Sequence, residues 1–206
     1  MAVVSGGTTL IDAGALDSGV PTGAMTLIKT LTASSSGTLS FVHGASSVVF
    51  DGTYKEYIFK FINIHPQTDG YNFTFNGSSD GGSNYNVTKT TTVFSAQHNE
   101  ADTNTFLGYH PAFDIAQGTG FQKLNANEVG ADNDQTISGT LQIFNPSSST
   151  FVKHFISTSS VAVTSDQMEN VFVAGYFNTT SALNAIQFKM SSGNIDAGTI
   201  KLYGIK

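Results

Sequence analysis

The chain contains no cysteine, no arginine and no tryptophan among its 206 residues. Without cysteine, neither a disulfide framework nor a thiolate metal site can form, so the fold must hold in any redox compartment. Arginine is the preferred bidentate partner of phosphate, and the formal net charge is -6, so we expect no nucleic-acid partner. Charged residues make up only 12% of the chain, about half the usual share. Their place is taken by Ser, Thr, Asn and Gly, which give a neutral, hydrogen-bonding surface.

Long apolar runs are also missing. No segment approaches the ~18 consecutive apolar residues of a transmembrane helix, so we expect no membrane partner. The first residues lack the basic region and apolar core of a signal peptide, and export would require another route such as host lysis. The length suits one all-β domain, and 16 Phe and 7 Tyr supply the bulk of a core.

What the chain does contain is a recurrent alternation of apolar and polar residues. Between Ile137 and Ile143, the apolar Ile137, Leu141 and Ile143 fall on one face and polar residues on the other. A side-chain period of two predicts strands with one buried face. Many such strands with short turns predict an all-β fold, an antiparallel β-sandwich that could take the form of a jelly roll, with an extended N-terminal arm.

The expected strands begin after residue 24. The segment Tyr54–Ile64 is apolar on both faces and predicts a central strand, with Ile64 opposing Phe61 and with Pro66 ending the ladder. One helical turn is a candidate at Asp166–Glu169. The full set of expected strands is Met25–Ala33, Thr38–Val42, Ser47–Phe50, Tyr54–Ile64, Tyr71–Phe75, Asn84–Ser95, Gln135–Asn145, Thr150–Thr158, Asn170–Phe177, Ala185–Met190 and Thr199–Ile205.

Residues 1–24 differ in composition from residues 25–206, which we assign to a single β-sandwich domain. The first 24 residues are small and aliphatic, with no aromatic side chain. They are interpreted either as a flexible leader or as an arm that docks on a neighbouring subunit, with a short amphipathic turn around Asp12–Leu16. The anchors of such an arm would be Val3, Val4, Leu10, Ile11, Leu16 and Val20.

The stretch 96–134 is the least regular and is expected to be a long loop, of the kind that is usually functional or an interface. It carries several candidate ligands. His98 and Glu100 would face the same side of a strand, but two ligands do not make a metal site, and a structural hydrogen-bonding role is favoured. Asp132 with Asp134, and the turn that begins at Asp80, resemble fragments of calcium loops without the terminal bidentate Glu. Turn formation is the favoured interpretation there, and ion binding stays open.

Motifs for catalysis are missing from the sequence. There is no Gly-x-Ser-x-Gly elbow, and Gly118–Gly120 lacks the Lys-Ser/Thr pair of a phosphate loop. The spacing of the acidic residues leaves open a pair of carboxylates suited to glycoside hydrolysis. We expect no enzyme and no cofactor. Exposed tyrosines could bind sugar, and the candidates are Tyr71, Tyr85 and Tyr109, although packing is the favoured role for them.

Residues 25–206 resemble a family of virion structural proteins of tailed phages, of the marine and freshwater podovirus type. The resemblance rests on an ordered set of short segments, the last of which is the most specific. The segments are Leu27–Thr30, Thr32–Ser35, Tyr54–Tyr57, Ile62–Pro66, His98–Ala101, Asp132–Gln135, Phe144–Ser147, Phe151–His154, Ser192–Ile195 and Gly198–Gly204.

The resemblance implies a non-enzymatic part of the virion, made in the cytoplasm of the bacterial host. A compact domain with an arm and no shaft suggests a capsid decoration (cement) protein, a homotrimer that binds the major capsid protein. The alternative is a tail fibre, adaptor or receptor-binding module that contacts tail proteins and recognises host glycan. A depolymerase is a third hypothesis. No family site is known to us that could be carried over to residues of this chain.

Overall fold

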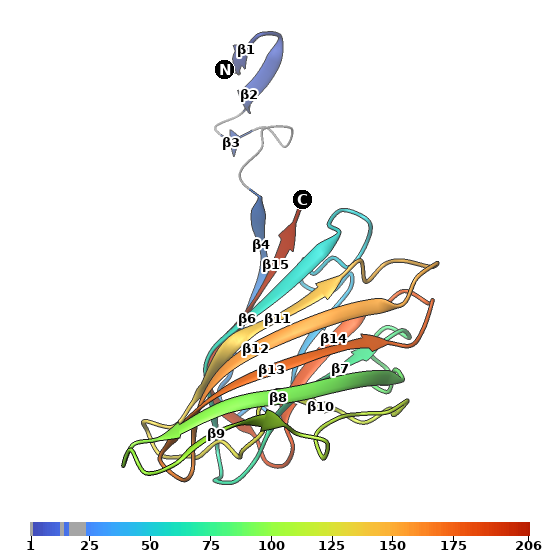
Figure 1. Cartoon of the computed structure of the whole chain (residues 1–206). Helices are drawn as coiled ribbons and strands as arrows, with labels where there is room; N and C mark the ends of the chain where they lie inside the picture. Colours follow the sequence, from blue (N-terminus) through green and yellow to red (C-terminus); the bar gives the residue numbers. More distant parts are fainter. Residues whose placement is uncertain (1, 13–14, 17–23) are drawn as a thin grey trace.

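The protein is an all-β sandwich in which every strand pairing is antiparallel. The computed structural model describes residues 2–12, 15–16 and 24–206, and none of these residues lies in a helix. Two sheets of unequal width pack face to face, and Figure 1 shows the wider sheet in front with β7, β10 and β14 behind it. The predicted antiparallel β-sandwich is therefore confirmed.

The wide sheet has eight strands and the narrow sheet has four, whereas a jelly roll has eight strands in all. In spatial order the wide sheet consists of β4 (Met25–Thr32), β15 (Ile195–Ile205), β6 (Glu56–Pro66), β11 (Ile137–Phe144), β12 (Lys153–Val163), β13 (Gln167–Phe177), β8 (Lys89–Asn99) and β9 (Thr105–Tyr109). The narrow sheet consists of β10 (Gln122–Lys123), β7 (Phe73–Ser78), β14 (Ala185–Met190) and β5 (Leu39–Val42).

The core between the two sheets is built from phenylalanine rings. Phe188 of β14 is fully buried and stacks on Phe73 of β7 with ring centroids 5.6 Å apart. From the wide sheet, Phe59 approaches Phe41 of the narrow sheet edge-on at 5.2 Å. Such pairs add about 0.5–1.5 kcal/mol each beyond their burial. The abundance of Phe in a chain without Trp is thus explained by the contact between the sheets.

The expected strands correspond to observed ones with a single exception. Ala185–Met190 matches β14 to the residue, and Pro66 ends β6, which lies between β15 and β11 as a central strand. The exception is Ser47–Phe50, which is not a strand: the Gly44 N–H donates to the Val48 carbonyl oxygen and closes a turn there. The alternating pattern resembles that of a strand because Val48 and Phe50 are both buried, but they project into the core from an irregular segment.

Two other predictions from the sequence were also wrong. Asp166–Glu169 is no helical turn, because Asp166 ends a tight turn and β13 starts at Gln167. The stretch 96–134 is not simply a loop: it contains the end of β8 and the strands β9 and β10. Both strands take their partners from β8 and β7, and such partners do not show in local periodicity.

The alternation within β6 is interrupted by a bulge. Ile62 is 42% exposed, whereas Ile64 is fully buried and joins Phe61 on the inner face. Between them Asn63 has a left-handed φ of 49°, and its N–H donates to Ser138 Oγ at 2.9 Å. The register of β6 shifts here against both neighbouring strands. The prediction that Ile64 opposes Phe61 was therefore wrong, because the extra residue re-aims the side chain.

The N-terminal residues form a small third sheet of β1 (Val3–Ser5), β2 (Thr8–Asp12) and β3 (Ala15–Leu16). Val3, Val4 and Ile11 are exposed, Leu10 is half-buried, Leu16 belongs to β3, and Val20 lies outside the described residues. The expected turn at Asp12–Leu16 is replaced by the end of β2 and by β3, with residues 13–14 outside the described part. Figure 1 shows β1 and β2 beyond the end of the sandwich where β4 begins.

Candidate interaction surface

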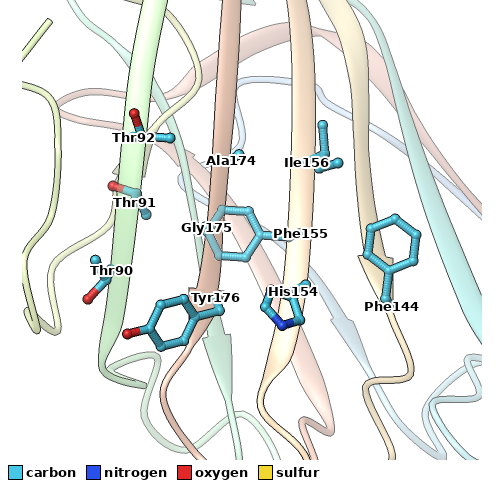
Figure 2. A pocket seen from close by; sticks show the side chains of 10 residues that line it. All are labelled: Thr90, Thr91, Thr92, Phe144, His154, Phe155, Ile156, Ala174, Gly175 and Tyr176. Carbon is cyan, nitrogen blue, oxygen red and sulfur yellow. The ribbon is translucent and has the colours of Figure 1, made fainter.

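A hollow with a volume of about 530 Å³ lies on the outer face of the wide sheet, over β8, β11, β12 and β13. We call it the outer groove. Figure 2 shows the four strands side by side with the side chains that line the groove. Two rows cross the strands: Thr90, Tyr176 and His154, continued by Phe144, and next to it Thr92, Ala174 and Ile156.

The groove exists because a small residue lies between aromatic ones. Side chains on one face of a strand recur every second residue, so Phe172, Ala174 and Tyr176 project from the same face of β13. Phe172 stacks on Phe94 of β8 with centroids 4.8 Å apart and an interplanar angle of 9°. Tyr176 lies 6.0 Å from the ring of His154. The methyl group of Ala174 leaves a trough between these two aromatic rows.

The floor of the groove depends on a glycine. A Cβ added to Gly175 would lie 2.7 Å from Phe155 Cζ and 2.7 Å from the Thr90 carbonyl oxygen. Phe155 comes from the inner face of β12, and Figure 2 shows its ring beside Gly175. Only glycine allows this ring to pack directly under the strand. The outer groove is thus supported by the main core.

One wall of the groove is held by Gln117, which follows β9 in a loop. Its Nε2 donates to Thr90 Oγ1 at 2.6 Å and to the Tyr176 hydroxyl at 3.4 Å, and its Oε1 accepts from Asn178 Nδ2 at 2.6 Å. Gln117 has a φ of 51°, which is uncommon for a residue other than glycine. The amide therefore fixes the loop and Tyr176 together. Sequence reasoning missed these residues, since their contact depends on the pairing of β8 with β13.

The lining of the outer groove bears no carboxylate, lysine or arginine. Lys89 and Lys153 lie on the opposite, inner face: both are fully buried, and each donates to one backbone carbonyl, of Gly120 at 2.6 Å and of Thr179 at 3.1 Å. Burial lowers the pKa of Lys89 to about 8 and also lowers the pKa of Lys153. A surface of this kind fits an uncharged, largely apolar partner.

The three predicted glycan tyrosines lie on separate segments. Tyr71 is half-buried and bridges to Val129, and the hydroxyl of Tyr85 packs over Gly82. Tyr109, on β9, is 57% exposed, and its hydroxyl donates to Asp114. No contact joins the three within the part of the chain that the structure describes. Tyr176, which lines the outer groove, was not among the predicted residues.

The predicted ion ligands make hydrogen bonds within their own turns. His98 Nε2 lies 3.0 Å from Asp102 Oδ1. Asp80 Oδ1 accepts from Ser78 Oγ, and both its oxygens accept from Asn84, so that the pKa of Asp80 falls to about 2. The backbone carbonyl of Asp132 accepts from the Gln135 N–H, and Glu100, Asp132 and Asp134 are exposed. Among residues 2–12, 15–16 and 24–206, no three His, Asp or Glu side chains could share a metal ion.

A buried polar chain runs inside the sandwich near β8 and β13. Ser95 Oγ lies 2.7 Å from His110 Nε2 and accepts from Gln97, which also donates to Glu169 at 2.8 Å. Glu169 accepts three further hydrogen bonds, from the N–H groups of Ala126 and Asn127 and from the Asn127 side chain. Ser95 and Glu169 are fully buried. Ser95 is therefore removed from solvent, and this network of hydrogen bonds fastens the loop before β11 to β8 and β13.

Comparison with protein-family models, with curated proteins and with solved structures gave no match. In the described part of the chain, no helix is long and apolar enough to cross a membrane.

Proposed function

We propose that this protein is a non-enzymatic structural component of a phage virion, a homotrimeric capsid decoration protein. The observation that carries the proposal is that the chain combines an apolar arm with a wide sheet whose outer face is uncovered. Leu27, Phe94, Ile156 and Met168 are each exposed by 44–52% on that sheet. Apolar side chains exposed along a sheet face are candidates for contacts with other proteins.

The family resemblance of residues 25–206 supplies the biological setting. A cement protein binds by area and shape, so no single side chain has to perform chemistry. The buried Ser95 and the turn-bound carboxylates agree with this reading. Residues 1–24 and the segment 96–134 would make the contacts with capsid protein and between copies.

The test is electron microscopy of intact particles labelled with gold-conjugated antibody against this protein. Regular labelling over the head supports the decoration role, and labelling confined to the tail overturns it. Deletion of residues 1–24 should leave a folded domain that no longer joins the particle. Normal incorporation of the truncated protein would show that the arm is not the attachment element.

The second candidate is a tail module that binds host glycan. It is favoured by the exposure of Tyr109 and by the threonine hydroxyls at the edge of the outer groove. A glycan array and binding to host cells distinguish the two functions, because a cement protein should give no signal in either assay. Release of reducing sugar from host polysaccharide would instead indicate a depolymerase.

A further inference from the structure

We propose that the outer groove receives the N-terminal arm of a second copy of this chain. The inference rests on the proposed function, in which the arm joins subunits, and it names the surface that the arm would occupy. Three observations carry it: the chemistry of the two surfaces, the incomplete packing of the arm, and the position of the groove relative to the start of β4.

The two surfaces match in charge and polarity. The segment 2–11, which contains the β1–β2 hairpin, has no charged side chain, and the residues lining the outer groove include neither carboxylate nor lysine. Val3, Val4 and Ile11 are exposed by 49%, 56% and 37%. Ile156 in the groove is exposed by 48%. Contact between them would remove apolar surface from water on both sides without burying a charge.

The arm needs a packing partner. In the described part of the chain, β1, β2 and β3 pair only with one another and form no ladder with the wide or the narrow sheet. A hairpin without a packed face is at best marginally stable in water. A second surface that covers Val3, Val4 and Ile11 would supply what the hairpin lacks.

The groove lies at the end of the sandwich from which the arm departs. Met25 pairs with Ile205, Ile205 with Glu56, and Glu56 with Phe144, which is in the row of the groove. From Met25 to His154 there are four strand-to-strand steps of about 4.8 Å, or roughly 19 Å in all. With β3 paired to β2, the eight residues between Leu16 and Met25 can still span up to about 28 Å. The arm thus leaves the sandwich at the same end as the groove, so a second copy that adjoins this end can offer its groove to the arm.

The absence of cysteine allows a direct test with the full chain. One variant carries Val4→Cys and a second, of different tag mass, carries Thr92→Cys in the groove. Mixing and mild oxidation should give the mixed disulfide dimer as the main product. The control replaces Thr92→Cys by Thr105→Cys, an exposed threonine on β9, and should give no dimer above the cysteine-free background.

A second measurement places a charge in the trough. When Ala174→Lys is added to the chain that carries Thr92→Cys, the mixed disulfide with the Val4→Cys chain should no longer form. In the full chain without added cysteines, Ala174→Lys should also reduce the oligomeric state measured by sedimentation velocity. Ala174→Ser should change neither result. Equal cross-linking of Val4→Cys to Thr92→Cys and to Thr105→Cys would overturn the inference. A third variant carries both Val4→Cys and Thr92→Cys in one chain, and a disulfide that forms only within that chain would also overturn it. Saccharide binding that is lost in Ala174→Lys, without any cross-link, would assign the groove to glycan instead.

The inference and the proposed function can fail separately. If the mixed disulfide is absent but gold labelling covers the head, the decoration role stands and the arm binds elsewhere. If the mixed disulfide forms but particles carry no label, the copies exchange arms and the virion role is wrong.

Discussion

Lys89 and Lys153 lie on the two sides of Phe177 in one row of the wide sheet: each is its register partner on a neighbouring strand. Both ammonium groups are fully buried and each has a single carbonyl acceptor, so neither is neutralised by a carboxylate. Burying a charge without a partner is costly unless its proton is released, which is why the pKa of Lys89 falls to about 8.

We expect Lys89→Met to stabilise the protein at pH 7. Because the pKa of Lys89 is about 8 when folded and 10.5 in the unfolded chain, the unfolded state holds more protons between these values, and stability rises with pH across that window. Below pH 8 the whole penalty is present, about 3 kcal/mol. Allowing for the orphaned Gly120 carbonyl, the gain at pH 7 should be about 1–2 kcal/mol.

Urea unfolding at pH 7 and pH 9.5 measures this effect, since the advantage of Lys89→Met over the natural chain should shrink at the higher pH. Lys55→Met, at an exposed position, is the control and should show no such pH dependence. A variant less stable than the natural chain at pH 7 would mean that the Lys89–Gly120 hydrogen bond outweighs the burial penalty.

Glu169→Ala should be strongly destabilising. It would leave the N–H groups of Ala126 and Asn127 and the amides of Asn127 and Gln97 without their acceptor in a buried site. Each buried donor left without an acceptor costs about 1–3 kcal/mol. Denaturant unfolding provides the measurement, with the exposed Glu100→Ala as the matched control. A loss below that of Glu100→Ala would show that water replaces the carboxylate.

Gly198→Ala should cost about 2–3 kcal/mol in the free energy of unfolding. Gly198 has a φ of 115°, and an added Cβ would lie 2.5 Å from the Asn63 carbonyl oxygen at the bulge of β6. Gly52→Ala is the control, because its Cβ would meet no atom within 4 Å. Similar melting temperatures for the two variants would argue that the bulge moves freely.

Leu107→Lys tests the free edge of the wide sheet. Leu107 is 77% exposed on β9, an edge strand without a charged side chain, and such edges tend to pair with other chains. The melting temperature should change by little, since the effect on stability should stay within about 0.5 kcal/mol. Concentration-dependent light scattering should fall. Unfolding of the variant instead would indicate that Leu107 is packed.

The inner faces of the strands could be predicted because burial imposes a period of two. Ile137, Leu141 and Ile143 are buried as predicted. The prediction for Ile64 failed because Asn63 inserts a residue through a left-handed φ, which no alternation of residue types reveals. The prediction for Ser47–Phe50 failed because buried side chains can also project from a turn.

The sequence by itself determined the fold class, since alternating residues and frequent turn residues permit only sheets, and the lack of cysteine excludes disulfides. Only the tertiary structure decided the functional surface. Thr90, Ala174 and His154 are far apart in the chain and meet through the pairing of β8, β13 and β12. The physical reason is that strand order depends on the non-local fit of whole faces, and local residue patterns carry no record of which strands become neighbours.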